Sequence, residues 1–376
     1  MRILFVTARC YPHLGGIETH VQEVGPRLAG LGHEIEVLTT DPGRHFPPED
    51  AVRGMRIRRV PAYPAQRDYY LSPWIFSEIV RGSWDLVHIQ GWATFVAPAA
   101  LLAAKMRGLP VVLTFHSGGH SSGIRNAVRG LQRALLRPLI RRAGALIGVS
   151  DFEADFFART MNIPRERFTV VPNGAETPAP SRGVSVDPDL IVSVGRLERY
   201  KGHHRAIEAM PHLLRRVPGA RLRIVGAGPY EEALRRLVAR HALQGRVTIE
   251  AIPGSERQRL ADLLASSGLF VLFSEYEAHP VALMEAISVG RPALVSHTTG
   301  LAEVADKGLC RSLPLTAGPE MTAACMIEGL RTQRVAREIA LPNWDDCTQA
   351  LLRVYHAVLD ARAASGVEMA PAMPST

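Results

Sequence analysis

The sequence predicts an α/β protein made of two doubly wound domains, each a parallel sheet covered by helices on both faces. With 376 residues, the chain is long enough for two domains of about 100–200 residues each. Short apolar segments alternate with longer amphipathic ones, as in repeated β-α-β units. The stretch from Pro172 to Pro188 is rich in Pro, Gly and Ser and lacks hydrophobic periodicity, which indicates a linker. The expected parts are a first domain over residues 1–175, a second over 186–343, a C-terminal helix over 344–362 and a flexible tail over 363–376.

In the first half, a β-loop-α-β unit is the clearest local pattern. Arg2 to Thr7 predicts a short buried strand, and a loop that contains Gly15 and Gly16 follows it. Ile17 to Leu31 has helical periodicity, and Glu34 to Thr39 alternates as a second strand. Further strands are expected at Leu86–Ile89, Val111–Phe115 and Ala145–Val149.

The second half repeats this alternation. Ligands of open α/β sheets bind beyond the carboxyl ends of the strands, so motifs that directly follow a strand are the candidates for a functional site. The expected strands are Leu190–Val194, Arg221–Val225, Val247–Glu250, Leu269–Phe273 and Pro292–Ser296. The expected helices are His203–Arg216, Tyr230–His241, Glu256–Ala265, Pro280–Val289 and Asp345–Ala361.

Composition and charge restrict the class of protein. No apolar run reaches the ~20 residues of a membrane-spanning helix, and the first residues turn polar too early for a signal peptide. The four cysteines form no CxxC pair, which argues against a disulfide framework or a metal site of the zinc type and favours a cytoplasmic location. The net charge is +8, and no acidic residue lies between Asp85 and Asp151. This local positive charge predicts attraction to phosphates, anionic lipid or nucleic acid.

The most specific motif leads from an apolar strand into a helix and carries Glu277 and Glu285. Glu277 is expected at the mouth of the helix, where a carboxylate can bind sugar hydroxyls, and Glu285 inside it, where a carboxylate can accept both hydroxyls of a ribose. The helix N-terminus between them offers N–H groups to a diphosphate, and the candidate donor-binding residues there are His279, Pro280 and Val281. Two solvated glutamates on a helix are the competing interpretation.

A second motif follows the strand that ends at Val194. Gly195 permits close approach of the backbone. Arg196 and Lys201 can converge on the two phosphates of a nucleotide diphosphate and stabilise that leaving group as a glycosidic bond breaks. Two solvated surface cations are the competing interpretation.

Three glycines and one histidine give weaker signals. Gly15 and Gly16 can let a helix N-terminus meet a diphosphate, although a plain turn also explains them. His116, at the end of a strand, can bond a transferred sugar or a phosphate oxygen, or can be a structural histidine. Gly226 lies in a turn that can frame a base or phosphates or merely reverse the chain, and its spacing is not that of a dinucleotide site.

A predicted helix carries arginines at four-residue spacing, which places them along one ridge. Such a helix can rest on anionic lipid headgroups, which would make the protein peripheral at the inner membrane face. A solvated basic face opposite a buried apolar face is the alternative. Aromatic residues are not interleaved, so a nucleic-acid groove is disfavoured. The arginines are Arg125, Arg129, Arg133, Arg137 and Arg141.

In their order along roughly residues 1–360, these motifs resemble the retaining GT-B glycosyltransferases, specifically glycosyltransferase family 4 (glycosyl transferases group 1). The two glutamates together with the Arg…Lys pair are the most specific part. The resemblance implies two facing Rossmann-like domains with parallel sheets, an interdomain cleft, and a final helix that crosses back onto the first domain. The matching segments are Gly15-Gly16, Thr114-Phe115-His116, Val149-Ser150, Val171-Pro172-Asn173-Gly174, Gly195-Arg196…Lys201-Gly202, Val225-Gly226-Ala227-Gly228, Glu277…Glu285 and Gly300-Leu301-Ala302-Glu303.

The resemblance also implies metal-independent transfer with retention at the anomeric carbon, with a nucleotide diphosphate sugar as co-substrate and no further cofactor. Many members of the family have Gly-Phe-Gly where this chain has Ala278-His279-Pro280. Pro280 lacks an N–H, so one possible backbone donor is lost, and His279 can replace it. The implied contacts are Arg196 and Lys201 with the diphosphate, Glu285 with the ribose, Glu277 with the donor sugar, His116 with the reacting sugar and Gly16 with the phosphates.

We expect front-face displacement, with a uridine diphosphate sugar as the first choice of donor and a guanosine or thymidine diphosphate sugar as the second. A sugar-nucleotide 2-epimerase of the same fold is the enzymatic alternative, but the motifs supply no convincing acid/base set for it. A non-catalytic sugar-nucleotide-binding protein is the other alternative. Polysaccharide, lipid-linked sugar and small-molecule acceptors all stay open, because the expected loops Pro42–Tyr70 and Ser117–Asn126 carry no signature.

Overall fold

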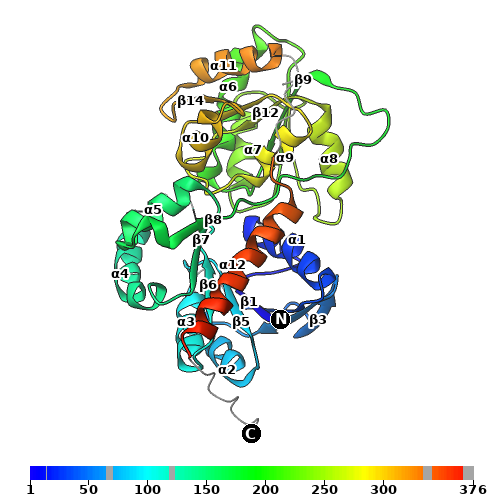
Figure 1. Cartoon of the computed structure of the whole chain (residues 1–376). Coiled ribbons are helices and arrows are strands. Elements are labelled where there is room, and N and C mark those ends of the chain that lie inside the picture. The colour runs from blue at the N-terminus through cyan, green and yellow to red at the C-terminus, as the bar shows by residue number, and fades with distance from the viewer. Residues whose placement is uncertain (14, 65–70, 118–122, 333–340, 367–376) are drawn as a thin grey trace. The chain divides into compact units, whose positions relative to one another are not determined.

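The computed structural model (Figure 1) describes residues 1–13, 15–64, 71–117, 123–332 and 341–366, without the side chains of 123–129 and 131. The chain forms two compact units. Unit 1 comprises Met1–Asn173 together with the chain from Trp344 onward, and unit 2 comprises Gly174–Asn343. Residues 367–376 of the expected tail lie outside the described part.

Unit 1 is built on an eight-stranded sheet in the order β3-β4-β2-β1-β5-β6-β7-β8. Neighbouring strands pair in parallel except β3 and β4, which are antiparallel. The strand order reverses between β1 and β5, where open sheets of this kind bind ligands. The strands are β1 (Arg2–Thr7), β2 (Glu34–Thr40), β3 (Glu49–Val52), β4 (Met55–Val60), β5 (Leu86–Gln90), β6 (Val111–Thr114), β7 (Ala145–Gly148) and β8 (Phe168–Val170).

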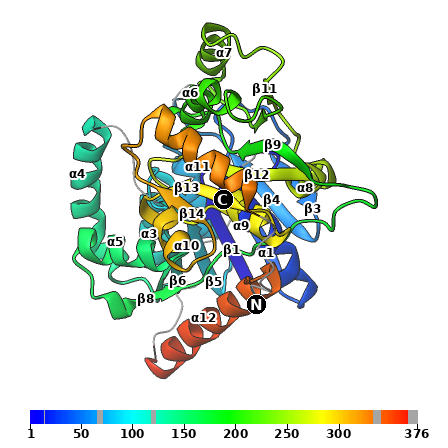
Figure 2. The same ribbon diagram turned by 90° about the horizontal axis from the view of Figure 1, so that it is seen from above.

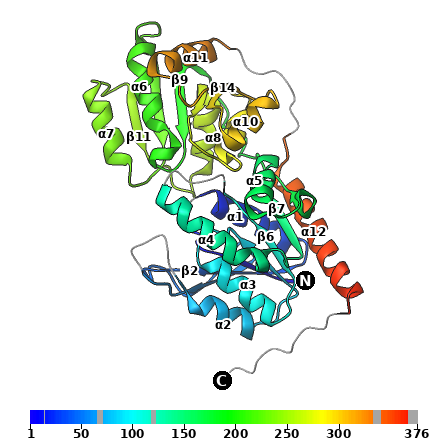
Figure 3. The ribbon, with the colours of Figure 1, turned by 90° about the vertical axis from the view of Figure 1, so that its left-hand side faces the viewer.

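Helices cover both faces of this sheet because successive side chains of a strand point to opposite faces. Leu4 and Val6 of β1 join one core with α2, α3 and α5, and Ile3 and Phe5 join another with α1 and α12. Figure 3 shows α2, α3 and α4 side by side, and Figure 1 shows α12 next to α1. The helices are α1 (Gly16–Gly30), α2 (Pro73–Arg81), α3 (Val96–Met106), α4 (Gly123–Ile140), α5 (Asp151–Met161) and α12 (Trp344–Ala364).

Unit 2 is built on a six-stranded sheet in the order β11-β10-β9-β12-β13-β14. All of its neighbouring strands pair in parallel. The order reverses between the central strands β9 and β12. The strands are β9 (Asp187–Val194), β10 (Arg221–Val225), β11 (Val247–Glu250), β12 (Ser267–Leu272), β13 (Ala293–Ser296) and β14 (Arg311–Leu313).

Helices also cover both faces of the second sheet. Ile191 and Val271 belong to a core with α6, α7 and α11, whereas Val192 and Phe270 belong to a core with α8, α9 and α10. Figure 2 shows α6 beside α11, and the two helices contact each other. The helices are α6 (His203–Leu214), α7 (Glu231–Arg240), α8 (Arg257–Ser266), α9 (Val281–Ser288), α10 (Thr299–Asp306) and α11 (Pro319–Arg331).

The elements expected from the sequence are confirmed to within three residues at each end. Several other elements were not expected. The expectation of a loop over Pro42–Tyr70 was wrong in the described part of that segment, because β3 and β4 form a hairpin there. The two strands turn at Arg53 and Gly54, whose φ angles are 51° and 83°. Two successive left-handed residues suit a type I′ hairpin turn. Met55 and Ile57 of β4 are buried, but arginines between and after them obscure this alternation in the sequence.

Candidate active site

The candidate site of unit 2 lies beyond the carboxyl ends of β9 and β12, between which the strand order reverses. The loop after β9 contains a turn of 3₁₀ helix, Arg199–Lys201. The loop after β12 leads into α9. The two loops are tied together, because the backbone N–H of Glu275 donates to the carbonyl of Tyr200 at 2.8 Å.

Lys201 and Glu277, one from each loop, form an ion pair. Nζ of Lys201 lies 2.6 Å from Oε1 of Glu277, and the two side chains are only 16% and 11% exposed to solvent. Ser274 Oγ donates to the same carboxylate oxygen at 2.7 Å. Because the pair is largely enclosed, its attraction is screened less than that of an open surface pair. The expected phosphate-binding lysine and the expected sugar-binding glutamate therefore meet at one point.

Two tyrosines bring Arg196 to the same place. Arg196 Nη2 donates to the hydroxyl of Tyr200 at 2.7 Å. The ring of Tyr200 stacks on that of Tyr276, with centroids 4.3 Å apart and an interplanar angle of 11°. Nζ of Lys201 lies 5.4 Å from the centroid of the Tyr200 ring, which adds a cation–π attraction. Both expected phosphate-binding cations thus contact one aromatic side chain, which the sequence reasoning did not single out.

The segment after β13 holds the loop of Glu277 in place. Thr299 Oγ1 accepts a hydrogen bond from the backbone N–H of Glu277 at 2.8 Å. The N–H of Gly300 donates to the carbonyl of Glu277 at 2.9 Å. A Cβ at Gly300 would lie 2.3 Å from the carbonyl oxygen of Ala278, so only glycine fits this approach. The backbone on both sides of the carboxylate is therefore fixed.

Two glycines allow the backbone segments of the site to approach each other. A Cβ at Gly226 would lie 1.9 Å from the carbonyl oxygen of Gly195, and a Cβ at Gly202 would lie 1.9 Å from that of Phe273. At Gly195 a Cβ would find its nearest neighbour, a side-chain atom of His203, at 3.6 Å. Packing thus requires Gly226 and Gly202, whereas Gly195 has room for a side chain.

A neutral histidine supports the loop after β9. His203 opens α6, and its Nδ1 lies 3.0 Å from Oγ of Ser193. Burial, with the charge of Lys201 as the second cause, lowers the pKa of His203 to about 4. At neutral pH the imidazole is therefore uncharged and adds no further cation to the site.

Glu285 is the fifth residue of α9, and its side chain is only 4% exposed. Its Oε1 accepts from Nη2 of Arg257 at 2.6 Å. A buried carboxylate needs a partner, so Arg257 compensates the charge of Glu285. The sequence reasoning missed Arg257 because it stands on another helix, 28 residues away. No local spacing indicates such a pair.

The start of α9 lies between the two glutamates. Pro280 is the N-cap residue and is buried, and the helix begins at Val281. Burial lowers the pKa of His279 to about 4. Its Nδ1 is enclosed and has no hydrogen-bond partner among the described residues. An enclosed polar nitrogen without a partner is unusual in a folded protein.

Gly15, Gly16 and His116 belong to unit 1, whereas the other expected site residues belong to unit 2. Gly15 is the N-cap of α1, and a Cβ on Gly16 would meet nothing within 4 Å. The surroundings of Gly16 therefore leave room for a ligand. His116 follows β6, and its Nε2 lies 2.6 Å from Oε1 of Gln90 at the end of β5.

A chain of buried polar groups continues from Gln90 to the C-terminal helix. Gln90 Nε2 lies 3.2 Å from Nδ1 of His88. The same Nδ1 atom lies 2.7 Å from the hydroxyl oxygen of Tyr355 in α12. His88 Nε2 lies 2.8 Å from Oγ1 of Thr114. Burial lowers the pKa of His88 well below its ordinary value and raises the pKa of Tyr355 well above it. Both groups are therefore neutral, and the network fixes α12 to the centre of the sheet.

The basic ridge differs from the expectation at its end. Arg141 lies one residue beyond α4, and its guanidinium donates to the carbonyl of Asn162 within unit 1. It is therefore engaged by the protein and does not continue a free ridge. Arg133 and Arg137 are partly buried, and the side chains of Arg125 and Arg129 lie outside the described part.

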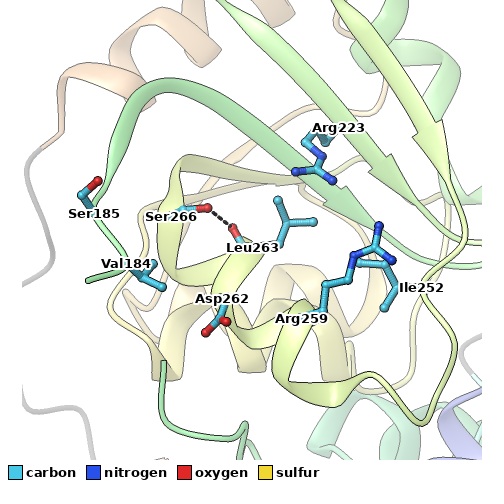
Figure 4. Close-up of a pocket in the computed structure, with 8 residues that line it drawn as sticks. All are labelled: Val184, Ser185, Arg223, Ile252, Arg259, Asp262, Leu263 and Ser266. Atoms are coloured by element: carbon cyan, nitrogen blue, oxygen red, sulfur yellow. Dashed lines mark hydrogen bonds between the residues drawn. The ribbon is translucent and has the colours of Figure 1, made fainter. Parts of the chain in front are cut away.

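A hollow of about 350 Å³ on unit 2 is lined by none of the expected site residues (Figure 4). Its guanidinium groups are neutralised within the protein, because Arg223 Nε and Arg259 Nη2 bond the two oxygens of Glu250 at 3.0 and 2.6 Å. It is therefore not the candidate site. The lining residues are Val184, Ser185, Arg223, Ile252, Arg259, Asp262, Leu263 and Ser266.

In the described part of the chain, no cluster of three or more His, Cys, Asp or Glu side chains is arranged to hold a metal ion. Within the same residues, no helix combines the length and the apolar character needed to cross a membrane.

Known proteins resemble both halves of the chain. Residues 14–178 match Glycosyltransferase Family 4, and residues 177–324 match Glycosyl transferases group 1. A glycogen synthase of Mycobacterium tuberculosis is 29% identical over 338 residues, covering 82% of this chain and 81% of the relative. A D-inositol 3-phosphate glycosyltransferase of Nocardiopsis dassonvillei is 26% identical over 393 residues, covering 93% and 91%. A GDP-mannose:cellobiosyl-diphosphopolyprenol alpha-mannosyltransferase of Xanthomonas oryzae is 27% identical, covering 79% and 78%.

Solved structures show the same fold. Sucrose-phosphate synthase from Thermosynechococcus elongatus superposes with a TM-score of 0.74 at 18% identity, covering 96% of this chain and all of that one. HepE of Anabaena, solved in complex with UDP, gives a TM-score of 0.70 at 17% identity, covering 97% of this chain and all of that one. Because the two sequence matches together span residues 14–324, the chain belongs to glycosyltransferase family 4 and is a glycosyltransferase of the GT-B type.

Proposed function

We propose that this enzyme is a retaining, metal-independent transferase that moves a sugar from a nucleotide diphosphate sugar to an acceptor hydroxyl. The observation that carries the proposal is the contact of Lys201 with Glu277 beside Arg196, where the strand order of unit 2 reverses. A lysine and an arginine held in one place suit a diphosphate, and an adjacent carboxylate suits the hydroxyls of a sugar.

Each residue then has a role set by its chemistry. Arg196 and Lys201 hold the diphosphate, and Glu277 binds the hydroxyls of the donor sugar. Glu285 accepts hydrogen bonds from the ribose, and the buried Nδ1 of His279 is a further polar contact at the start of α9. The N-terminus of α1 at Gly16, where a side chain would meet nothing, contacts the phosphates from unit 1.

UDP is the favoured nucleotide. HepE of Anabaena was solved with UDP, and also with UDP and glucose, which supports a uridine diphosphate sugar as donor. The relative from Xanthomonas oryzae is named for GDP-mannose, so a guanosine diphosphate sugar is the second choice.

In the proposed reaction, the bond between the anomeric carbon and the diphosphate breaks and the electron pair stays on the diphosphate. Arg196 and Lys201 stabilise the negative charge that develops there, as fixed cations do in electrostatic catalysis. The acceptor hydroxyl attacks from the face that the diphosphate leaves and passes its proton to a phosphate oxygen. His116 contacts the reacting sugar. Because the two cations neutralise the leaving group, the mechanism requires no divalent metal.

The test begins with thermal-shift measurements against a panel of nucleotide sugars, followed by transfer assays with the best donor and a panel of acceptors. We predict that a nucleoside diphosphate is released only when an acceptor is present. The glycosylated product should have the same anomeric configuration as the donor. Chelation of divalent metals should leave the rate unchanged.

Other results of the same assays would contradict the proposal. A C2-epimerised sugar without an acceptor would identify an epimerase, and binding without any product would identify a sugar-nucleotide-binding protein. An inverted anomeric configuration would contradict retention.

We also propose that α4 brings the enzyme to anionic membrane surfaces, through Arg133 and Arg137 together with Arg125 and Arg129. Because this attraction is electrostatic, it should weaken with salt. Sedimentation with anionic vesicles at low salt tests it, and neutral vesicles are the control. A protein that stays in the supernatant with anionic vesicles would contradict the membrane contact.

A further inference from the structure

Glu153 of α5 is a fully buried carboxylate to which the proposed mechanism gives no role. Three backbone N–H groups donate to it: those of Val149, His116 and Ser117. The bond from Val149 to Oε2 is 2.8 Å long, and Ser117 donates to Oε1. The carboxylate therefore joins the start of α5 to the turn that carries His116.

This turn has an unusual backbone. His116 has a φ of 51°, in the left-handed region that residues with a side chain rarely adopt. Such a conformation persists only where its surroundings hold it. Here the N–H groups of His116 and Ser117 both point at the carboxylate of Glu153. The carboxylate thus supplies the hydrogen bonds that fix the backbone at His116.

Helix capping alone does not account for this arrangement. Ser150 is the N-cap of α5, and its Oγ already accepts from the N–H of Glu153 at 3.1 Å. In a capping box, the glutamate bonds the backbone of the cap residue of its own helix. The contact from Glu153 to Ser117 instead crosses 36 residues to the loop after another strand.

The ring of His116 is held separately. Its Nε2 lies 2.6 Å from Oε1 of Gln90, a buried residue at the end of β5. With the ring held by Gln90 and the backbone held by Glu153, the orientation of His116 is determined from two sides.

We propose that Glu153 is a positioning residue that holds the turn at His116, so that the imidazole of His116 is preset toward the sugar being transferred. This inference rests on the proposed function for the role of His116. It does not make Glu153 a catalytic residue, because the carboxylate is enclosed and bonds backbone only in the contacts described.

The decisive variant is Glu153→Gln. It keeps the shape of the side chain but replaces one carboxylate oxygen by an amide N–H₂ group, which cannot accept hydrogen bonds from the backbone N–H groups around it. The matched control is Ser150→Ala, which weakens the same helix by removing its cap but keeps the carboxylate. Transfer is measured at saturating and limiting donor, well below the unfolding temperature of each variant. We expect kcat of Glu153→Gln to fall on the order of 100-fold, as small misplacements at an active site do, with KM for the donor unchanged. Ser150→Ala should keep the wild-type kcat.

A second readout follows His116 itself. In protein labelled with ¹⁵N-histidine, the ring signal of His116 is assigned from its absence in His116→Ala. The proposal expects this signal to shift in Glu153→Gln and to stay in place in Ser150→Ala. If Glu153→Gln changed neither kcat nor the His116 signal, the positioning role of Glu153 would be wrong. An equal loss of kcat in Glu153→Gln and Ser150→Ala would also contradict it. If the wild-type enzyme transfers no sugar at all, the proposed function fails, and the ring signal still decides whether Glu153 positions His116.

Discussion

Replacing Glu153 by glutamine should change how the stability of unit 1 depends on pH. Burial raises the pKa of this carboxyl from its ordinary value of 4.5 to about 7, although three backbone N–H groups lower it. One pKa unit corresponds to about 1.36 kcal/mol, so the rise to about 7 is equivalent to about 3 kcal/mol of unfolding free energy. The side chain is fully buried, so solvent screening does not reduce this figure.

The sign follows from the direction of the change. Below pH 4.5 the carboxyl is protonated in both the folded and the unfolded chain, and its contribution to stability is fully present. Between pH 4.5 and about 7 only the folded chain keeps the proton, so stability falls as the pH rises. Above about pH 7 the contribution has been lost and changes no further. A glutamine has no proton to lose in this range, so this component is absent from Glu153→Gln.

Tryptophan fluorescence reports this change for unit 1 alone, because all four tryptophans lie in it: Trp74, Trp84, Trp92 and Trp344. Urea unfolding of wild type, Glu153→Gln and Ser150→Ala is measured from about pH 4.5 to about pH 8. The difference in unfolding free energy between wild type and Glu153→Gln should decrease by about 3 kcal/mol from the lowest to the highest pH of this range. Ser150→Ala should be less stable than wild type by a constant amount. If the unfolding free energies of wild type and Glu153→Gln changed with pH in parallel, the buried carboxyl would not have a raised pKa, contrary to this prediction.

Four further variants test other parts of the structure. Lys201→Met removes a cation from the leaving group and should lower kcat by about 100–1,000-fold in a transfer assay, and a loss below tenfold would contradict its role. Gly226→Ala would place a Cβ 1.9 Å from the carbonyl of Gly195 and should abolish the thermal shift with UDP. Gly16→Ala meets nothing within 4 Å and should fold with the wild-type melting temperature. Tyr355→Phe removes the hydroxyl that lies 2.7 Å from the buried Nδ1 of His88 and leaves only the longer contact with Gln90. It should lower the unfolding free energy of unit 1 in urea by about 1–3 kcal/mol, and a stability equal to that of wild type would contradict this.

The sequence was most informative where strand, loop and helix follow each other in a short span. β9 and β12 are apolar strands, and each is followed by a polar loop and the start of a helix. Lys201 and Glu277 lie in these two loops, so the sequence could place both residues at the carboxyl edge of one sheet. Their contact at 2.6 Å arises because β9 and β12 are neighbours in the sheet. A parallel doubly wound sheet favours this strand order, but the local sequence pattern does not specify it.

The residues that sequence reasoning missed are those whose partners are distant in the chain. Arg257 pairs with Glu285 across two helices, and Glu153 bonds the turn after β6. On its own helix, Glu153 has the spacing of an ordinary capping glutamate after Ser150. Only the packing of α5 against the sheet shows that the carboxylate reaches another loop. The β3–β4 hairpin was missed because its turn is Arg53-Gly54, without the Asn or Asp that usually marks such turns.

A crystal structure of the enzyme with UDP would show which side chains hold the nucleotide. We predict the diphosphate within hydrogen-bond distance of Arg196 and Lys201, with the ribose hydroxyls on the carboxylate of Glu285. A nucleotide bound elsewhere, or bound with these three side chains turned away from it, would contradict the proposed site.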